Sequence, residues 1–377
     1  MKIGIMTYWK SSCNYGEQLQ NYALQEYLRE LGHEAFLIRY DYDNDRIRRP
    51  LHKKIEMLIN PRKMAGYIEV VKNGRKLMKE GVIHPRGFEE FRQKNLSFSR
   101  VYSSVDDLRN DPPEADMYLT GSDQVWNSFG SGLSEMRNRL SAFFLDFGAD
   151  EVIRASYAAS WGRNEVSEEE ADFIRPLLKR FAAISVRERS GIDICRNLGR
   201  DDSGQAVDPV MLFGPEKYRG LYLSNGVKPS NERYVLFYYM NHDGAYDRQT
   251  VFDWADSMGL KVKYVTDDWH DDFPRLFPSV YEWLNLLDNA EYVVTNSYHC
   301  SLLSILFRKR FGVIRRFGIH TGMNTRLDSL FELCGIEPRY IDDYNYDVLN
   351  RAIQEPNEEM INKTWHPDMI VGMVERV

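Results

Sequence analysis

The chain has 377 residues, of which 49 are Lys or Arg and 56 are Asp or Glu, so its formal net charge is −7. Hydrophobic residues make up 43% and aromatic residues 13% of the sequence, which is enough to fill a core and excludes an intrinsically disordered chain. The acidic balance argues against a protein that binds nucleic acid through its overall charge. A chain of this length predicts about two domains.

Four cysteines, at positions 13, 195, 300 and 334, have neither the spacing of a zinc knuckle nor that of a Cys-x-x-Cys redox motif. Scattered cysteines in a long chain are typical of free thiols in a reducing compartment. The N-terminus is apolar for too few residues to form a signal-peptide core, and no apolar run approaches the roughly 18 residues of a transmembrane helix. These features predict a cytoplasmic protein.

Strands and helices alternate along the first half of the chain. Lys2–Thr7 has the composition of a short buried strand, the apolar spacing from Leu19 to Leu31 predicts a helix, and Glu34–Tyr40 resembles a second strand. A strand–helix–strand unit of this length implies a parallel sheet. Further elements are expected as strands at 116–121, 152–158, 182–186 and 205–207, and as helices at 167–181 and 189–198.

Residues 214–232 are rich in Gly, Pro, Asn and Ser, which is typical of a linker. After them the alternation resumes, with strands expected at 233–239, 260–265, 291–295 and 311–314, and helices at 245–258, 279–289, 300–307 and 325–334. The pattern predicts two Rossmann-like α/β domains, 1–215 and 216–345, and a helical tail, 346–377, that could cross back to the first domain. Ligands bind at the carboxyl ends of parallel strands, so we expect a substrate cleft between the domains.

Residues 46–100 interrupt this alternation and contain 15 basic and 5 acidic residues. Met64, Tyr67, Ile68 and Val71 have helical spacing, so the segment is predicted to be an inserted basic helical arm. A charge run of this kind is typical of a solvated helix face, and that interpretation is favoured. The alternative is peripheral contact with an anionic membrane surface or with a lipid-linked phosphorylated acceptor.

Asn14, Tyr15 and Gly16 follow the first strand and open a helix. Such a turn offers backbone N–H groups to an anion or a polar ligand, although the G-x-G-x-x-G spacing of a dinucleotide site is absent. Capping of the helix by Asn14 or Tyr15 explains the same residues equally well.

The loop after strand 116–121 brings together Asp123, Gln124 and Trp126. An aromatic ring beside amide and carboxylate groups suits a sugar, because the ring stacks on C–H faces while polar groups bind hydroxyls. The alternative is a buried tryptophan that follows a turn.

Basic residues and a histidine follow three other predicted strands. Arg187 could capture a carboxylate or phosphate, with an ion pair to Glu188 as the alternative. His299, flanked by Ser297 and Ser301, would lie at a helix N-terminus, where an imidazole can bind an anion or transfer a proton. Packing of this histidine at a domain interface is the alternative.

Arg315 and Arg316 end the next strand, with His320 nearby. Several cations at one edge of the sheets predict an anionic ligand. Two acidic segments, Asp41-Tyr42-Asp43 and Asp267–Asp272, have metal-binding composition but are better explained as polar loops, and no metal is expected.

Six motifs occur in order: NYGEQLQNYALQ (14–25), GSDQVWN (121–127), YAASWG (157–162), ISVRE (184–188), VDPVML (207–212) and TNSYHCSLLSILF (295–307). Together they resemble the polysaccharide pyruvyl transferase family. The resemblance implies a two-domain, glycosyltransferase-B-like fold that moves a pyruvyl group from phosphoenolpyruvate onto a sugar, usually as a cyclic ketal, in surface or capsular polysaccharide biosynthesis. It implies that Arg187 and His299 serve phosphoenolpyruvate binding or catalysis. Two positions depart from the family pattern, namely Cys300 in place of Gly and Glu17 where a small residue is commoner.

The residue chemistry agrees with this resemblance. Arg187 and Arg315 or Arg316 would clamp the carboxylate and phosphate of the donor, together with Ser297 and Ser301. His299 would supply a proton or neutralise the phosphate, and Asp123 would accept a hydroxyl proton. The remaining candidates, expected to face a nucleotide- or lipid-linked sugar acceptor, are Asn14, Tyr15, Gly16, Gln124 and Trp126.

Phosphoenolpyruvate would be a substrate, and no cofactor is expected. A glycosyltransferase of the same fold that uses a nucleotide-sugar donor is the alternative enzyme. A non-catalytic member of a polysaccharide assembly complex is the alternative from another class.

Overall fold

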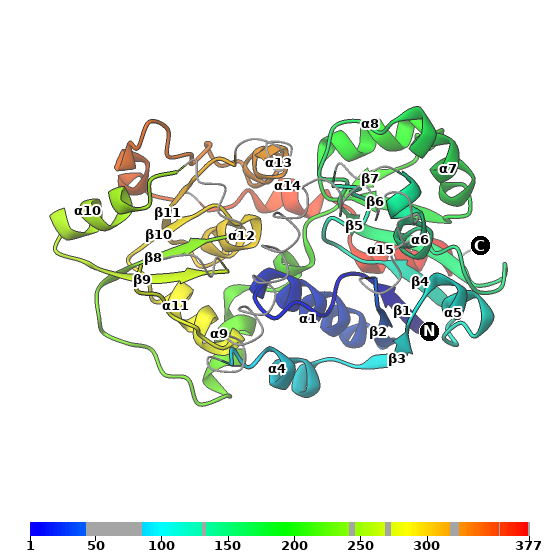
Figure 1. Cartoon of the computed structure of the whole chain (residues 1–377), viewed down its shortest axis with the longest axis horizontal. Coiled ribbons are helices and arrows are strands. Elements are labelled where there is room, and N and C mark those ends of the chain that lie inside the picture. The colour runs from blue at the N-terminus through cyan, green and yellow to red at the C-terminus, as the bar shows by residue number, and fades with distance from the viewer. Residues whose placement is uncertain are drawn as a thin grey trace, which may run out of the picture.

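A computed structural model of the chain describes residues 1–42, 85–129, 133–240, 246–267, 273–316, 324–353 and 355–375. These residues form two α/β lobes that lie side by side, with helix α1 (Tyr15–Glu30) between their sheets (Figure 1). The N-terminal lobe contains a seven-stranded sheet and the C-terminal lobe a four-stranded sheet. The chain is therefore an α/β protein built on two sheets, as predicted.

The sheet of the N-terminal lobe has the strand order β3-β2-β1-β4-β5-β6-β7, and all its pairs are parallel. Its strands are β1 (Lys2–Met6), β2 (Glu34–Tyr40), β3 (Phe98–Tyr102), β4 (Met117–Thr120), β5 (Ile153–Ala159), β6 (Ala183–Val186) and β7 (Gly204–Gln205). The other helices of this part of the chain are α4 (Phe88–Asn95), α5 (Val105–Asn110), α6 (Leu133–Phe143), α7 (Glu168–Leu178) and α8 (Arg189–Asn197).

The sheet of the C-terminal lobe has the order β11-β10-β8-β9 and is also parallel. Its strands are β8 (Tyr234–Tyr239), β9 (Lys261–Thr266), β10 (Tyr292–Thr295) and β11 (Arg310–Val313). The helices from residue 209 onward are η1 (Pro209–Leu212), α9 (Pro215–Leu223), α10 (Gln249–Ser257), α11 (Val280–Asp288), α12 (Tyr298–Leu306), α13 (Asn324–Cys334), η3 (Tyr346–Asn350), α14 (Glu358–Asn362) and α15 (Pro367–Val374).

The central strands are apolar and buried along their whole length. All residues of β4, β8 and β10 are buried, as in parallel sheets that have helices on both faces. Two helices that cover these sheets begin with a capping box, formed by Ser167 with Glu170 in α7 and by Ser279 with Glu282 in α11. Local sequence and strand burial therefore support the same layered arrangement.

Several elements were not predicted. α4 and β3 fall inside the range 46–100 assigned to a basic arm, and β3 is an edge strand of the first sheet. β3 has the mixed sequence FSRVY and is mostly half-buried or exposed, so it lacks the apolar signal of the inner strands. The predicted linker 214–232 contains α9, while most of the predicted arm, residues 43–84, lies outside the described residues.

The C-terminal segment returns to the N-terminal lobe, where α15 packs against β5 and β6 (Figure 1). The Trp365 backbone N–H donates to the Gln205 carbonyl at 2.9 Å. The indole of Trp365 occupies the space beside Gly204 where a Cβ would stand, only 1.7 Å from its Nε1. The segment thus crosses from one lobe to the other.

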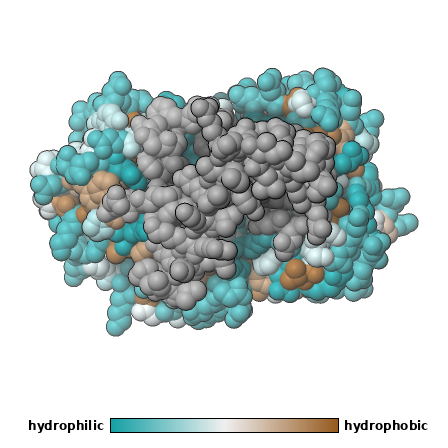
Figure 2. All heavy atoms as spheres, in the orientation of Figure 1, coloured by the Kyte–Doolittle hydropathy of each residue, from teal (hydrophilic) through white to brown (hydrophobic). Residues whose placement is uncertain are grey.

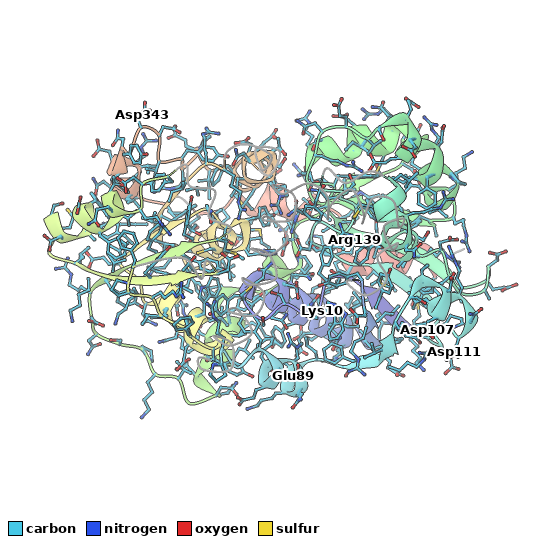
Figure 3. The ribbon with its side chains drawn as sticks, in the orientation of Figure 1. Lys10, Glu89, Asp107, Asp111, Arg139 and Asp343 are labelled. Atoms are coloured by element: carbon cyan, nitrogen blue, oxygen red, sulfur yellow. The ribbon has the colours of Figure 1, made fainter. Side chains whose placement is uncertain are left out.

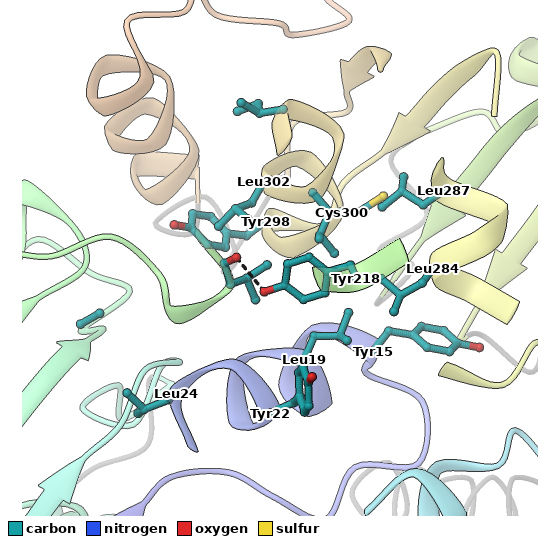
Figure 4. Packing of buried hydrophobic residues seen from close by; sticks show 14 of the residues in the cluster. Tyr15, Leu19, Tyr22, Leu24, Tyr218, Leu284, Leu287, Tyr298, Cys300 and Leu302 are labelled. Atoms are coloured by element: carbon teal, nitrogen blue, oxygen red, sulfur yellow. Dashed lines mark hydrogen bonds between the residues drawn. The ribbon is translucent and has the colours of Figure 1, made fainter. Parts of the chain in front are cut away.

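Aromatic residues fill the space between the lobes. Tyr15 of α1 stacks on Trp283 of α11 with ring centroids 4.8 Å apart, and its hydroxyl donates to the Pro278 carbonyl at 2.7 Å. Figure 4 shows Tyr15 facing Leu284 of α11, and the Tyr218 hydroxyl bonded to a backbone carbonyl. One continuous hydrophobic cluster includes residues of both lobes, so the lobes share a core.

The visible surface outside the grey residues is mainly hydrophilic, with small scattered hydrophobic areas (Figure 2). None of the helices in the described part of the chain has the length and apolarity needed to cross a bilayer.

Candidate functional site

Each of the two sheets has one point at which the strand order reverses. In the first sheet the order reverses between β1 and β4, and in the second between β8 and β10. Such points are the usual ligand sites of open α/β sheets. In the C-terminal lobe the side chain of Asn296, just after β10, joins two strand ends, donating to the Met240 carbonyl at 2.7 Å and accepting from its N–H at 2.9 Å.

Arg187 follows β6 and is buried at this edge. Its Nη1 donates to Asp208 Oδ2 at 2.7 Å and lies 3.4 Å from the Ser122 hydroxyl. Its Nη2 lies 4.0 Å from Asp123 Oδ1, and its guanidinium lies 4.5 Å from the ring centre of Tyr298 in the other lobe. The structure therefore brings the predicted donor-binding arginine to the boundary between the lobes.

Asp208 is the buried counter-charge of this arginine. Its Oδ1 accepts the Val210 N–H at 3.1 Å at the start of η1, and its Oδ2 accepts from Ser122 at 3.2 Å. The same Oδ2 lies 3.3 Å from His299 Nε2. Burial alone would raise the pKa of Asp208, but the cationic charges of His299 and Arg187 outweigh burial and hold this pKa well below its usual range.

His299 stands in the first turn of α12 and is buried between the lobes. One side of its ring faces Asp208, and the other faces Gly16 in the first turn of α1. A Cβ added to Gly16 would lie 2.3 Å from both Cγ and Nδ1 of His299. Glycine is therefore required at position 16 for the close approach of α1 and α12.

Arg326 in the first turn of α13 provides a second buried guanidinium. It lies 5.5 Å from the ring centre of Tyr298, so both arginines contact the same aromatic ring. Burial and the charge of Arg187 lower the pKa of Arg326 to about 10, which leaves the group charged at neutral pH. We call Arg187, Asp208, Tyr298, His299 and Arg326 the inter-lobe charge cluster.

The inter-lobe charge cluster has donors that no described residue satisfies. Arg187 Nε and Nη2 and Arg326 Nε are shielded from solvent and have no hydrogen-bond acceptor among the described residues. Glu188 Oε2 is a buried acceptor that has no hydrogen-bond donor among the described residues. The other oxygen, Oε1, accepts from the N–H groups of Trp161 and Gly162. Buried polar groups are normally paired, so unpaired donors beside two cations mark a site for an anionic ligand.

Asp123 lies at the edge of this cluster in a strained backbone conformation. Its φ is 85°, and the nearby Ala158 on the paired strand end has a φ of 50°. Strain of this kind costs about 1–3 kcal/mol and concentrates at functional sites. Gln124 next to it donates its N–H to Asp123 Oδ1 at 2.8 Å and accepts from Asn127 through its side chain.

Several residues that were predicted to bind substrate cap a helix or pack in the interior of the protein. Asn14 caps α1 by accepting from the Glu17 N–H, and Ser297 caps α12 by accepting from the Cys300 N–H. Ser301 is buried and donates to the Ser297 carbonyl at 2.9 Å. Tyr15 packs on Trp283, as described above, so its ring belongs to the contact between the lobes.

Trp126 is a core residue, not an exposed platform for a sugar. Its side chain is completely buried and stacks on Phe144 with centroids 4.8 Å apart. Its Nε1 donates to the Phe143 carbonyl at 3.2 Å. The buried-tryptophan alternative therefore describes this residue.

The two arginines after β11 differ. Arg316 is half-buried, and its Nε donates to the Asn296 carbonyl at 3.2 Å, next to the site. Arg315 is also half-buried, but its side chain is 41% exposed and pairs with Asp342 at 3.2 Å. His320 lies outside the described residues.

Neither acidic segment forms a metal site within the described residues, where no group of three or more His, Cys, Asp or Glu side chains converges. Asp41 forms an ion pair with Lys10. Asp43 and residues 268–272 lie outside the described ranges.

Three members of the cluster, Asp208, Tyr298 and Arg326, were not among the candidate site residues of the sequence analysis, although Tyr298 lies in the motif at 295–307. Asp208 ends a predicted strand before a proline, and that position was a usable signal. Arg326 stands in the first turn of a predicted helix, where the helix dipole disfavours a cation, so its presence there requires another reason.

The fold, with its two parallel sheets in two lobes, is of the glycosyltransferase-B type. The polysaccharide pyruvyl transferase family profile matches residues 14–316, and the chain belongs to this family of transferases. No curated protein has a significant match to the chain.

Among solved structures, UDP-N-acetylglucosamine 2-epimerase from Rickettsia bellii is similar, with 8% identity, coverage of 100% of this chain and 95% of that chain, and a TM-score of 0.50. UDP-GlcNAc 2-epimerase from Methanocaldococcus jannaschii, in complex with UDP-GlcNAc and UDP, has 12% identity, coverage of 100% and 99%, and a TM-score of 0.49. At this identity the likeness concerns the fold alone.

Proposed function

We propose that the protein transfers a pyruvyl group from phosphoenolpyruvate onto a sugar of a surface or capsular polysaccharide precursor. The observation that carries this proposal is the pair of buried guanidiniums, Arg187 and Arg326, with unpaired N–H donors between the lobes. Phosphoenolpyruvate is a small dianion or trianion, so a buried site of this charge suits it better than an uncharged sugar.

One edge of the Arg187 guanidinium is placed so that it can bind phosphoenolpyruvate. Nη1 donates to Asp208. Nε and Nη2 together form the other edge of the guanidinium and have no hydrogen-bond acceptor among the described residues. This edge has the fork spacing that binds two oxygens of a carboxylate or phosphate. These atoms are shielded from solvent, so the donor reaches them only when covering side chains move or the lobes part.

The proposed reaction balances without an oxidant or reductant. A proton adds to the methylene carbon of phosphoenolpyruvate, and the first acceptor hydroxyl forms a C–O bond to the adjacent carbon. The bond from that carbon to the phosphate oxygen then breaks, and the second hydroxyl closes the ketal. The two hydroxyls release two protons, of which one replaces the proton given to carbon and the other leaves with phosphate.

Residue roles follow from placement around the inter-lobe charge cluster. The guanidiniums hold the anion and stabilise the departing phosphate, while Asp123, held in a strained loop at the edge, accepts a hydroxyl proton. The acceptor is a nucleotide- or lipid-linked sugar, the reaction takes place in the cytoplasm, and no cofactor takes part in this scheme.

Calorimetric titration with phosphoenolpyruvate tests the proposal. We expect Arg187→Ala and Arg326→Ala each to weaken binding at least about tenfold, because each removes a charge-assisted hydrogen bond. Arg189→Ala is a matched control, since Arg189 lies two residues away, is exposed, and forms an ion pair with Glu332 at the surface of the described part of the chain. We expect this variant to bind as the wild type does.

A second assay separates the alternatives by product. Release of inorganic phosphate from phosphoenolpyruvate with a glycan acceptor supports the proposal, whereas release of a nucleoside diphosphate from a nucleotide sugar identifies a glycosyltransferase. If the wild-type protein binds no phosphoenolpyruvate, the proposed donor is wrong.

A further inference from the structure

Arg139 of α6 is a half-buried cation in the N-terminal lobe and is not part of the inter-lobe charge cluster (Figure 3). Its Nη2 donates to the Asn127 carbonyl at 3.2 Å. Its Nε is shielded from solvent and has no hydrogen-bond acceptor, and no carboxylate among the described residues forms an ion pair with its guanidinium. A shielded, unpaired donor on a guanidinium marks a place for an anionic group of a ligand.

Arg139 contacts residues 121–129, the loop that follows β4 and contains Asp123. The guanidinium lies 5.2 Å from the ring centre of Phe129 and 5.8 Å from that of Tyr8. The Tyr8 hydroxyl in turn lies 3.5 Å from the carbonyl oxygen of Gln124, the neighbour of Asp123. Arg139 is therefore held at the carboxyl end of the first sheet, where open α/β sheets bind ligands, beside the loop that reaches the inter-lobe charge cluster.

Phe129 stands in the same loop with an exposed ring and a strained backbone. The residue is 44% exposed, and its φ of 52° lies in the left-handed region that bulky residues rarely adopt. The Asn127 side chain supports this conformation by accepting the Phe129 N–H at 2.7 Å. An exposed ring gains little from burial, so packing does not account for the strain, which is typical of functional sites. An exposed aromatic face beside a cation suits a sugar that carries an anionic group, because the ring packs on C–H groups while the cation binds the anion.

We infer that Arg139 and Phe129 form the acceptor subsite, in which the guanidinium binds a phosphate attached to the acceptor sugar and the ring stacks on that sugar. A phosphate next to the sugar is common to nucleotide-linked and lipid-linked acceptors. The inference rests on the proposed function for the reaction of this acceptor, although the binding can be measured without phosphoenolpyruvate. Phe129 then has the role that was predicted for Trp126, and the same loop also supplies Asp123, the proposed proton acceptor.

Calorimetric titration of the full chain with sugar phosphates tests the inference. The probes are the 1-phosphates of glucose, galactose and N-acetylglucosamine, each compared with its uncharged methyl glycoside. We expect the wild type to bind at least one of these sugar phosphates about tenfold or more tightly than its glycoside, because a charge-assisted hydrogen bond is gained. Arg139→Gln should lose this preference. A wild type that binds every phosphate no better than its glycoside overturns the inference.

Arg137→Gln is the matched control for Arg139→Gln. Arg137 stands two residues away on α6 and is exposed, with its guanidinium 4.6 Å from the ring centre of Phe173. The control therefore removes the same charge and a similar aromatic contact from the same helix. We expect it to bind sugar phosphates as the wild type does. Equal loss of affinity in both variants would show a general effect of positive charge and would overturn the inference.

The inter-lobe charge cluster can also attract a sugar phosphate, so a second pair of titrations separates the two sites. Arg187→Gln should leave the affinity for the sugar phosphate within about twofold of the wild type, and Arg139→Gln should do the same for phosphoenolpyruvate. Loss of sugar-phosphate binding in Arg187→Gln but not in Arg139→Gln overturns the inference. A wild type that binds no phosphoenolpyruvate contradicts the proposed function and leaves the sugar-phosphate result standing.

Phe129→Gly tests the stacking ring, because it removes the aromatic face and also relieves the strained φ. We expect affinity for the sugar phosphate to fall about threefold or more, whereas the melting temperature should not fall, since glycine adopts this φ without steric cost. Phe129→Tyr should keep the affinity of the wild type. A lower melting temperature with unchanged affinity would mean that the ring only packs on Arg139, which overturns its role in binding.

Competition against the bound sugar phosphate distinguishes the two carriers. Stronger competition by the nucleoside diphosphate of the same sugar identifies a nucleotide-linked acceptor. Stronger competition by a short polyprenyl diphosphate of that sugar, added in detergent, identifies a lipid-linked acceptor. Either result supports the inference, whereas competition by neither means that no phosphate of such an acceptor binds at Arg139 and overturns it.

Discussion

Arg187 and Arg315 both follow a parallel strand, yet they have opposite environments. Arg187 lies after β6, an inner strand flanked by β5 and β7, and its side chain is 1% exposed. Arg315 lies after β11, the edge strand of its sheet, and its side chain is 41% exposed, stacked over Tyr340 and paired with Asp342. A cation at a strand end can therefore become part of a buried site, as Arg187 does, or remain a surface charge, as Arg315 does.

Ion pairs at the surface of the N-terminal lobe resemble the pair of Arg315 with Asp342. Asp107 and Asp111, labelled in Figure 3 beyond the edge of the sheet, both pair with Arg100. All three lie at the surface, where such pairs contribute little free energy. The inter-lobe charge cluster differs because its charges are enclosed and its remaining donors are unpaired.

The largest expected effect comes from Gly16→Ala, which pushes the two helix N-termini apart at the enclosed site. The new methyl group would lie 2.3 Å from His299, whose ring is held on its other side by Asp208 and cannot retreat. We expect a loss of about 1–3 kcal/mol of unfolding free energy and a large loss of transferase activity. Urea denaturation and a phosphate-release assay measure the two effects.

Gly220→Ala in α9 is the matched control. A Cβ at Gly220 meets nothing within 4 Å, so this substitution should leave activity unchanged and stabilise the protein by about 0.5–1 kcal/mol through helix propensity. Equal behaviour of the two glycine variants would show that the approach of α1 to His299 is not tight in solution.

A smaller effect is expected from Glu17→Gln, which removes a buried ionisable group in the first turn of α1. Glu17 accepts the Ser11 N–H at 2.7 Å, but burial, helped by the charge of Asp123, raises its pKa to about 8 from an ordinary 4.5. The folded protein thus holds this proton more tightly than the unfolded chain, and stability falls as the pH rises between these values. The variant should melt at a higher temperature than the wild type at pH 9 and at about the same temperature at pH 4.

Glu114→Gln serves as the exposed counterpart, because the Glu114 side chain is 91% exposed beside Lys2. We expect its melting temperature to follow that of the wild type at both pH values. If Glu17→Gln behaves in the same way, the Glu17 carboxyl is not enclosed in solution.

The sequence was sufficient to predict the two parallel sheets and to gather Arg187 and His299 at one edge, because inner strands have continuous apolar runs and their ends meet at one side of a sheet. The sequence was not sufficient to predict how deeply each candidate side chain is buried. The same reasoning placed Arg315 and Trp126 at the site, whereas in the structure the Arg315 side chain is partly exposed and pairs with Asp342, and Trp126 is buried in the core.

The members that were missed depend on contacts between distant parts of the chain. Asp208 receives Arg187 from another strand and His299 from the other lobe, and Arg326 joins them only through the ring of Tyr298. A local pattern can mark Asp208 as a residue at a strand end, but it does not carry these contacts. Arg326 also lies beyond residues 14–316, where the family profile matches, so the resemblance could not supply it either.

The smallest effect is expected from Arg315→Ala, and it tests the comparison of strand ends most directly. This arginine loses an exposed ion pair and a stacking contact with Tyr340, so unfolding free energy should change by no more than about 0.5–1 kcal/mol. Affinity for phosphoenolpyruvate should stay within about twofold of the wild type, since no charge-assisted contact to the donor is removed. Urea denaturation and calorimetric titration check both values beside Arg187→Gln, which removes the same charge from the inner strand end. If Arg315→Ala weakens donor binding as much as Arg187→Gln does, the edge strand contributes to the site, and the donor must extend from the inter-lobe charge cluster as far as β11.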